Sequence, residues 1–347
     1  MKLKLAFSGT LLLGLVAAAF LFSSSASAAT SPCSDPDSLT NMPSGPVTVS
    51  AAMTQDFGRV LVIGSGSYQG CSLYLLTSDQ LHSLTGVPYA CSDNPNVKKK
   101  PCDTVLWPAL LTDGTPIAGP GVDPRLLGTV TRTDLGLAGV SSVQQVTYNG
   151  WPLYRFFRDT NPGDTVGANQ NDPVTTTPGI WYLLNPRGGI PATGPAELEL
   201  ETAPVDGTGP DATVLAARMD NDYTPFPDTA FPVYTLSRDR GTHQHNRGHH
   251  SRWHRMGRVN DACQGLCSVY WPPLLTSGWP EAGAGVDQRA IGVIMRPDGS
   301  WQVTYHHRPL YLFNGDAYVG GSSPVGMQGI YGADDQFGLW DTIPPVN

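Results

Sequence analysis

Residues 145–154 read QVTYNGWPLY, two runs of β-branched, apolar and aromatic residues on either side of Asn149-Gly150. Asn-Gly is typical of a two-residue hairpin turn, because both central positions of that turn need a positive φ angle. A similar stretch, QVTYHHRPLY, returns at residues 302–311, with His306-His307 at the place of the turn. The sequence therefore predicts the same β-hairpin twice. Histidines suit this turn less well, so the second hairpin is expected to be looser or its histidines to have another use.

The similarity extends outward from the hairpin in both directions. WPALL at residues 107–111 returns as WPPLL at residues 271–275, and GPGVD at residues 119–123 returns as GAGVD at residues 283–287. Matches in the same order along the chain predict an internal duplication. The strand-like runs of the second copy, separated by turn residues, predict a three-stranded antiparallel meander; these runs are residues 291–296, 301–305 and 309–313.

We therefore predict an all-β protein of two tandem antiparallel repeat units, meander-like or sandwich-like, stapled by disulfides and without long helices. One short helical turn is expected at residues 78–84. Gly and Pro supply 39 and 31 of the 347 residues, and only 14% are charged, which argues against a coiled coil. The predicted divisions are a signal peptide (1–28), an extended N-terminal segment (29–50), unit A (51–190), a linker (191–211) and unit B (212–347), with an insertion at 240–258.

The N-terminus is typical of a secretory signal. Lys2 and Lys4 precede an apolar stretch at residues 11–22 and a small-residue cleavage site at residues 26–28. The apolar stretch is short for a membrane span. We expect an exported protein without a transmembrane segment, either periplasmic or extracellular. Cys33 follows a proline, which disfavours a lipid anchor.

An even number of cysteines in an exported chain favours disulfide bonds. Each repeat places a cysteine pair just before its Trp-Pro segment, so we predict Cys91–Cys102 and Cys263–Cys267. Cys33 and Cys71 are left as the third pair. A zinc site at Cys263 and Cys267 with nearby histidines is the alternative.

Each repeat also holds two copies of a Tyr-x-(aromatic or Leu)-x-x-Asp motif. The four copies are Tyr74 to Asp79, Tyr154 to Asp159, Tyr234 to Asp239 and Tyr311 to Asp316. With the Trp-Pro and QVTY segments, the chain resembles the bacterial secreted-repeat lipoprotein family defined by this motif, from about Val60 to Trp340. The resemblance implies export and a small β-rich fold, and no established activity. The chain departs from the family in its cysteine context and in His306-His307.

The motif has two interpretations. In a strand its Tyr and the following aromatic residue share one face, and its Asp falls beyond the strand end. The structural interpretation is a buried aromatic pair followed by an Asp that accepts hydrogen bonds from turn amides. The functional interpretation is a set of ligand or cation sites at the sheet ends. Trp107 and Trp271 are similarly expected to be core residues, with sugar stacking as the alternative.

Each repeat carries a positively charged insertion ahead of its Trp-Pro segment, in a chain of net charge −8. The first holds Lys98, Lys99 and Lys100; the second holds His243, His245, His249, His250, His254, Arg240, Arg247, Arg252, Arg255 and Arg258. The histidine spacing suits Cu or Zn, whereas the arginines suit an anionic surface, polysaccharide or partner protein. A solvated loop without a ligand is the third interpretation. The acidic balance argues against nucleic acid.

The sequence contains none of the common catalytic signatures, such as Gly-x-Ser-x-Gly, His-Glu-x-x-His or a phosphate-binding Gly-Lys-Ser/Thr. We therefore predict an exported binding or structural protein of the cell envelope or extracellular space, and we assign no catalytic residue. Metal binding through the histidines is the alternative, and an enzyme of unrecognised type is the third possibility.

Overall fold

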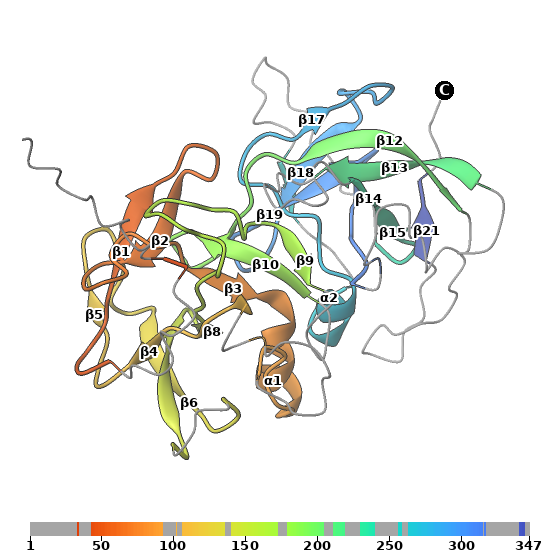
Figure 1. Cartoon of the computed structure of the whole chain (residues 1–347). Helices are drawn as coiled ribbons and strands as arrows, with labels where there is room; N and C mark the ends of the chain where they lie inside the picture. Colours follow the sequence, from red (N-terminus) through yellow and green to blue (C-terminus); the bar gives the residue numbers. More distant parts are fainter. Residues whose placement is uncertain are drawn as a thin grey trace, which may run out of the picture. The chain divides into compact units, whose positions relative to one another are not determined.

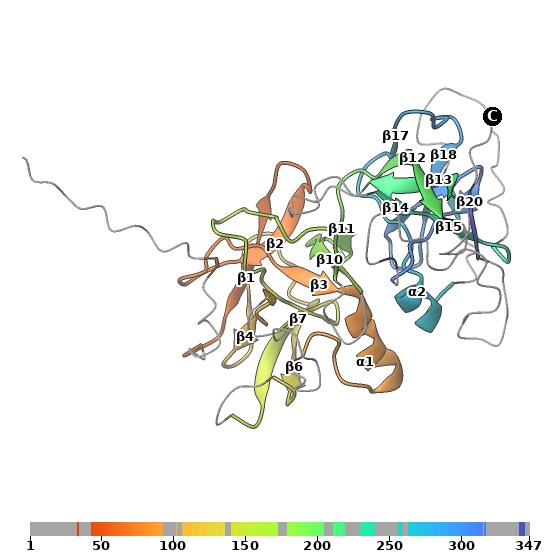
Figure 2. The same cartoon turned by 45° about the vertical axis from the view of Figure 1, so that its right-hand side comes forward.

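The hairpin at residues 145–154 forms as the sequence predicts. In the computed structural model, β7 (Val143–Tyr148) and β8 (Trp151–Pro152) pair antiparallel, and Asn149 and Gly150 between them have φ angles of 50° and 81°. Strand β4 (Leu111–Thr112) shares the edge of β7 that β8 occupies, and β6 (Leu127–Arg132) pairs antiparallel along the opposite edge. Figure 1 labels β4, β6 and β8, and Figure 2 labels β7.

The structure describes most of the chain after the predicted signal peptide. The described residues are 33–34, 43–92, 102, 106–135, 140–172, 179–204, 211–218, 230–239, 256–258, 263–314, 316 and 340–343. We call residues 33–192 the first half and residues 196–343 the second half. Outside the described residues lie the predicted signal peptide, the three lysines at 98–100 and residues 240–255 of the His/Arg insertion.

The second half repeats the predicted meander. β18 (Ile291–Met295), β19 (Trp301–Tyr305) and β20 (Arg308–Pro309) pair antiparallel in that order, and β16 (Met256–Arg258) adds to β18 in parallel. His306 and His307 have φ angles of 46° and 65°. The second hairpin thus has the same two-residue turn as the first, and it is not looser.

A three-element pattern recurs beside each meander. β1 (Thr48–Met53) pairs antiparallel with β2 (Arg59–Ile63) and in parallel with β5 (Ile117–Ala118). In the second half, β12 (Glu197–Pro204) pairs antiparallel with β13 (Asp211–Arg218) and in parallel with β17 (Glu281–Ala282) (Figure 2).

Strand β12 corrects the expectation that residues 191–211 form a linker. Glutamates stand at every second position from Glu197 to Glu201, and the residue after the first of them is Leu198. This alternation is typical of a strand with one buried face. Leu198 is fully buried. Residues 197–204 therefore belong to the second half as its first strand.

The remaining strands complete the two halves. In the first, β10 (Gly179–Leu184) pairs with β3 (Tyr74–Leu76), β9 (Gln170–Asp172) and β11 (Pro191–Ala192). In the second, β15 (Tyr234–Leu236) pairs with β21 (Trp340–Thr342), and β14 (Ala230–Pro232) pairs with β13. The described part of the chain is thus all-β, built from several small sheets.

The helices are short. A 3-10 turn η2 (Thr77–Asp79) and α1 (Gln80–Thr85) lie where one helical turn was predicted, and Gly86 ends α1 with a left-handed φ of 74°. Helix α2 (Leu266–Tyr270) was not predicted. None of the described helices is long and apolar enough to cross a bilayer.

Three disulfides and a shared core hold the strands together. The bridges are Cys33–Cys71, Cys91–Cys102 and Cys263–Cys267, as predicted. One apolar cluster contains buried residues of both halves, including Tyr182 and Leu275, and residues 31–347 form one compact unit. Two smaller clusters lie around Trp107 and Trp271, one in each half.

Candidate functional site

The two motif copies of the first half bond to each other crosswise. The Tyr74 hydroxyl donates to Asp159 Oδ2 at 2.7 Å, and the Tyr154 hydroxyl donates to Asp79 Oδ2 at 2.6 Å. The Tyr74 and Tyr154 backbones also exchange a pair of hydrogen bonds, at 2.9 and 3.0 Å. Each copy thus supplies the aspartate for the tyrosine of the other. We call this arrangement the Tyr–Asp clasp.

The second oxygen of each aspartate accepts from backbone amides of a turn. Asp79 Oδ1 accepts from Ala90 N at 3.0 Å and Cys91 N at 3.4 Å. Asp159 Oδ1 accepts from Val166 N at 3.0 Å. The clasp therefore joins the strand-like Tyr positions to the following turns, in the way the structural interpretation of the motif expected.

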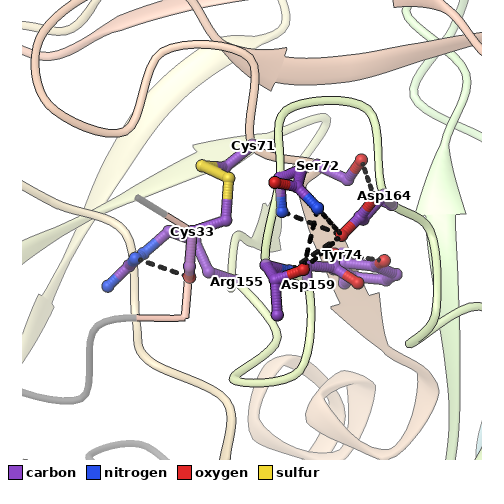
Figure 3. Close-up of a disulfide and its surroundings, with 9 residues drawn as sticks. Cys33, Cys71, Ser72, Tyr74, Arg155, Asp159 and Asp164 are labelled. Carbon is purple, nitrogen blue, oxygen red and sulfur yellow. Dashed lines mark hydrogen bonds between the residues drawn. A yellow bond between two sulfur atoms is a disulfide. The ribbon is translucent and has the colours of Figure 1, made fainter. Parts of the chain in front are cut away.

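The Asp159 side of the clasp lies beside the first disulfide (Figure 3). Arg155 Nη1 donates to the carbonyl of Cys33 at 3.3 Å, and Ser72, next to Cys71, donates through Oγ to the carbonyl of Asp164 at 2.6 Å. The bridge thus ties the N-terminal Cys33 to the segment that leads into β3, the strand that carries Tyr74.

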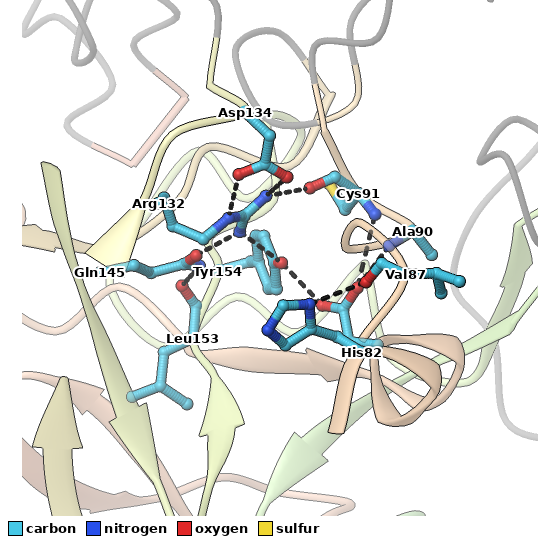
Figure 4. Close-up of polar contacts among 10 residues, drawn as sticks. His82, Val87, Ala90, Cys91, Arg132, Asp134, Gln145, Leu153 and Tyr154 are labelled. Atoms are coloured by element: carbon cyan, nitrogen blue, oxygen red, sulfur yellow. Dashed lines mark hydrogen bonds and ion pairs between the residues drawn. The ribbon is translucent and has the colours of Figure 1, made fainter. Parts of the chain in front are cut away.

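The Asp79 side is reinforced by a buried guanidinium (Figure 4). Arg132 Nη1 donates to the Tyr154 hydroxyl at 3.2 Å and to Gln145 Oε1, while Nη2 donates to the carbonyl of Cys91 at 2.7 Å. Asp134 pairs with Arg132 Nε at 2.6 Å. Arg132 is 1% exposed, so this ion pair offsets the cost of burying its charge.

Burial dominates the protonation of the clasp. It raises the pKa of Asp79 to about 6, although the Arg132 charge and the Tyr154 hydroxyl act in the opposite direction. It raises the pKa of Asp159 to about 8, against the hydrogen bonds from Tyr74 and Val166. The pKa values of both tyrosines are raised as well, chiefly by burial. Desolvation therefore favours the neutral forms of these groups.

Stacked tryptophans surround the clasp. Trp107 lies on Trp181 with ring centroids 3.8 Å apart and an interplanar angle of 9°. Tyr74 meets the edge of Trp107 at 5.3 Å, and Tyr154 meets Trp181 at 5.2 Å. Phe156 packs against Trp107 at 4.2 Å. Because Trp107 is 2% exposed, it is a core residue and does not offer a face to a sugar in solvent.

The second half repeats these contacts. Trp271 lies on Trp340 at 3.9 Å and 5°, Tyr234 meets Trp271 at 5.4 Å, and Tyr311 meets Trp340 at 5.1 Å. The Tyr234 and Tyr311 backbones exchange two hydrogen bonds of 2.9 Å. Trp271 is fully buried, as Trp107 nearly is.

The crosswise bond also recurs in the second half. The Tyr234 hydroxyl donates to Asp316 Oδ2 at 2.7 Å. Asp239 and Tyr311, the other two motif residues, are both buried, at 7% and 0% exposure. All eight motif residues named from the sequence are thus buried, and in the second half Tyr234, Tyr311 and Asp316 come together as their counterparts do in the first.

Most of the other site residues predicted from the sequence lie in parts of the chain that the structure does not describe. The backbone of Arg258 lies in β16, and the remaining lysines, histidines and arginines of the two insertions lie outside the described residues. Cys263 and Cys267 are bonded to each other, which leaves no thiolate for the alternative zinc site. Among described residues, no three His, Cys, Asp or Glu side chains are grouped closely enough to hold a metal ion.

Sequence reasoning missed six residues that belong to or surround the two clasps. Arg132 and Gln145 have counterparts in Arg296 and Gln302, where Arg296 Nη1 donates to Gln302 Oε1 at 2.7 Å. Their signal was present, since Gln145 and Gln302 begin the repeated stretch and both arginines are followed two residues later by Asp. Trp181 and Trp340 lie outside every repeated stretch that we recognised, so nothing in the sequence singled them out.

One part of the chain is similar to a known protein family. Residues 143–176, which include β7, β8 and the second motif copy, match the model of a family described as a secreted repeat of unknown function. Neither the curated proteins nor the solved structures gave a match to the chain. That the second half is a further unit of this family stays a prediction. The family that the Tyr-to-Asp motif suggested is thus the one whose model residues 143–176 match.

Proposed function

We propose that this protein is an exported binding scaffold in which the Tyr–Asp clasp is structural and the charged insertions make contact with an anionic partner. The motif residues support the structural part. Asp79 uses both carboxylate oxygens on a tyrosine and on turn amides, and it is 2% exposed. A ligand from solvent would have to displace these hydrogen bonds. Breaking the hydrogen bonds of a buried carboxylate costs free energy.

The observation that supports contact through the insertions is where they join the described structure. The lysines at 98–100 lie between Cys91 and Cys102, and Cys91 N donates to the clasp residue Asp79. The His/Arg insertion ends just before Cys263, whose partner Cys267 accepts at its carbonyl from Trp271 N at 2.8 Å. Both insertions therefore adjoin a disulfide ahead of a Trp-Pro segment: the first lies inside the loop that its bridge closes, and the second precedes its bridge.

The charge of the insertions indicates the class of partner. No acidic residue occurs between Asp239 and Asp261, whereas the chain as a whole has a net charge of −8. Guanidinium groups suit carboxylate, sulfate and phosphate groups, because their planar fork donates two parallel hydrogen bonds. An anionic polysaccharide or surface is the partner that this charge fits best.

Retention on a heparin column tests this proposal. The wild-type chain is expected to bind at low salt and to elute as salt rises, because the contact is electrostatic. Replacing Lys98, Lys99 and Lys100 by Ser, or Arg247, Arg252, Arg255 and Arg258 by Ser, should lower the eluting salt concentration. The matched control is Arg125→Ser with Arg289→Ser, two exposed arginines that lie in corresponding turns outside the insertions. Equal elution of all variants would contradict the proposal.

Metal binding by the same insertion is the second candidate. The observation that favours it is the spacing of His243, His245, His250 and His254, which suits Cu or Zn on an extended or helical segment. Calorimetric titration of each metal into the wild type and a variant lacking residues 242–256 tests it. Stoichiometric binding that disappears with the deletion is expected; weak binding unchanged by the deletion removes this candidate.

A further inference from the structure

A pocket of about 380 Å³ lies at the edge of the core shared by the two halves. The first half contributes η2, α1, the β7–β8 hairpin and the segment from β10 to β11, and the second half contributes residues between Ser268 and Asp298. Helices α1 and α2 contact each other there. This volume falls in the range of pockets that bind small molecules.

Tyr182 supplies a buried hydroxyl to the pocket. Its side chain lines the pocket and is 1% exposed, and its hydroxyl has no hydrogen-bond partner among the described residues. A buried hydroxyl without a partner costs about 1–3 kcal/mol, so such groups are rarely kept without a reason. A ligand that reaches the hydroxyl from the pocket would satisfy it.

The second half shows that the fold does not require this tyrosine. Trp181 and Trp340 occupy corresponding places, opposite Leu76 and Leu236 in their sheets. The next residue is Tyr182 in the first half and the exposed Asp341 in the second. The two halves thus share a tryptophan at the clasp. They differ at the next residue, which lines the pocket in the first half.

The indole of Trp151, which also lines the pocket, likewise has no aromatic counterpart in the second half. Trp151 lines the pocket and is half-buried, and it stands opposite Tyr148 in the first hairpin. The corresponding residue of the second hairpin, opposite Tyr305, is Arg308. The pocket therefore contains two aromatic residues, Tyr182 and Trp151, whose counterparts in the second half are not aromatic.

The other walls define the chemistry of the ligand. Gln80 and Ser83 bring an amide and a hydroxyl from α1, and the acidic and basic residues of the lining are Arg296, Asp298 and the clasp residue Asp79. Arg296 donates to Gln302, and Asp298 Oδ1 accepts from Ser300 N at 2.9 Å and Ser300 Oγ at 2.6 Å. Asp79 accepts from Tyr154 and from turn amides, so all three groups are engaged within the protein. A charged ligand gains little here, whereas an uncharged molecule with hydroxyls and a flat apolar face fits.

We propose that this pocket binds a monosaccharide or disaccharide, with Trp151 packing on the apolar face of a sugar ring and the Tyr182 hydroxyl bonded to a sugar hydroxyl. The described residues that line the pocket all lie outside residues 98–100 and 240–258, so this proposal rests on a different part of the chain from the charged insertions.

Calorimetric titration of the full exported chain with glucose, N-acetylglucosamine, maltose and chitobiose tests the proposal. Binding of at least one of these sugars is expected. Tyr182→Phe should weaken that binding about tenfold, the effect of one lost hydrogen bond, without lowering the melting temperature, since it removes a hydroxyl that had no partner. Trp151→Ala should weaken it further.

Arg308→Ala and Asp341→Asn are the matched controls, because they change the corresponding positions of the second half, and sugar binding should stay as in the wild type. If none of the four sugars binds at millimolar concentration, the proposal is wrong. It is equally wrong if Tyr182→Phe and Trp151→Ala leave the affinity unchanged. Heparin retention, measured on the same variants, should not change, which separates this site from the one proposed for the insertions.

Discussion

In the first half Trp107 stacks on Trp181 at 3.8 Å, and in the second half Trp271 stacks on Trp340 at 3.9 Å. The residues around these stacks differ. The cysteine pairs are separated by 11 residues in one half and by 4 in the other. The comparison teaches that the buried clasp is the constant part of the repeat, while turns, loops and exposed side chains vary. Variable positions that are nevertheless buried, such as Tyr182, are therefore the places to look for function.

Removing a clasp tryptophan should have the largest effect. Trp107→Ala and Trp271→Ala each delete a buried indole stacked on another, and each should cost about 3–5 kcal/mol of unfolding free energy. Urea denaturation measures both. Similar losses of unfolding free energy would support the equivalence of the two clasps, and a much smaller loss in one half would contradict it. Met53→Ala, at a side chain 68% exposed, is the control and should change little.

The pH dependence of stability should be the next largest effect. An unfolded aspartate has a pKa near about 3.9, whereas folding raises the pKa of Asp79 to about 6 and that of Asp159 to about 8. The folded chain thus holds protons that the unfolded chain loses. The stability from these groups is complete below about pH 4 and is lost as the pH rises through 6 and 8, by roughly 3 kcal/mol for Asp79.

Urea midpoints measured from pH 4 to pH 9 test this expectation. Asp79→Asn and Asp159→Asn should each flatten the decline, because a neutral amide cannot ionise. Asp113→Asn, at an exposed position, is the control and should leave the decline as it is. A stability that rises with pH over this range, in wild type and variants alike, would contradict the protonation that we assign to the clasp.

The two local disulfides should differ in what they contribute. A bridge stabilises mainly by restricting the unfolded chain, and more so for a longer loop. Replacing both cysteines by Ala should cost about 3 kcal/mol for Cys91–Cys102, separated by 11 residues, and about 2 kcal/mol for Cys263–Cys267, separated by 4. Urea denaturation of the two double variants measures the difference. The reverse order would show that the second bridge has a role beyond closing a loop.

Much of this architecture could be predicted because local chemistry encodes it. Asn149-Gly150 predicted a hairpin, and the repeated order of segments predicted the cysteine pairs. Strand β12 was missed because proline, glycine and threonine near it suggested a linker, although its Glu/Leu alternation was visible. The crosswise bonding of the clasp could not be predicted. It depends on Tyr74 and Asp159 meeting across 85 residues, and no local pattern records such a contact.

Exchanging the two hairpin turns should have the smallest effect and tests the comparison most finely. His306 and His307 adopt φ angles of 46° and 65°, which side chains with a Cβ atom disfavour. Replacing them by Asn-Gly should stabilise the chain by about 1 kcal/mol, and placing His-His at Asn149-Gly150 should destabilise it by a similar amount. Urea midpoints of the wild type and of both exchange variants measure these changes. If His306-His307→Asn-Gly instead lowers stability, the two histidines make contacts that compensate for their strained backbone, and the second hairpin has acquired a role that the first lacks.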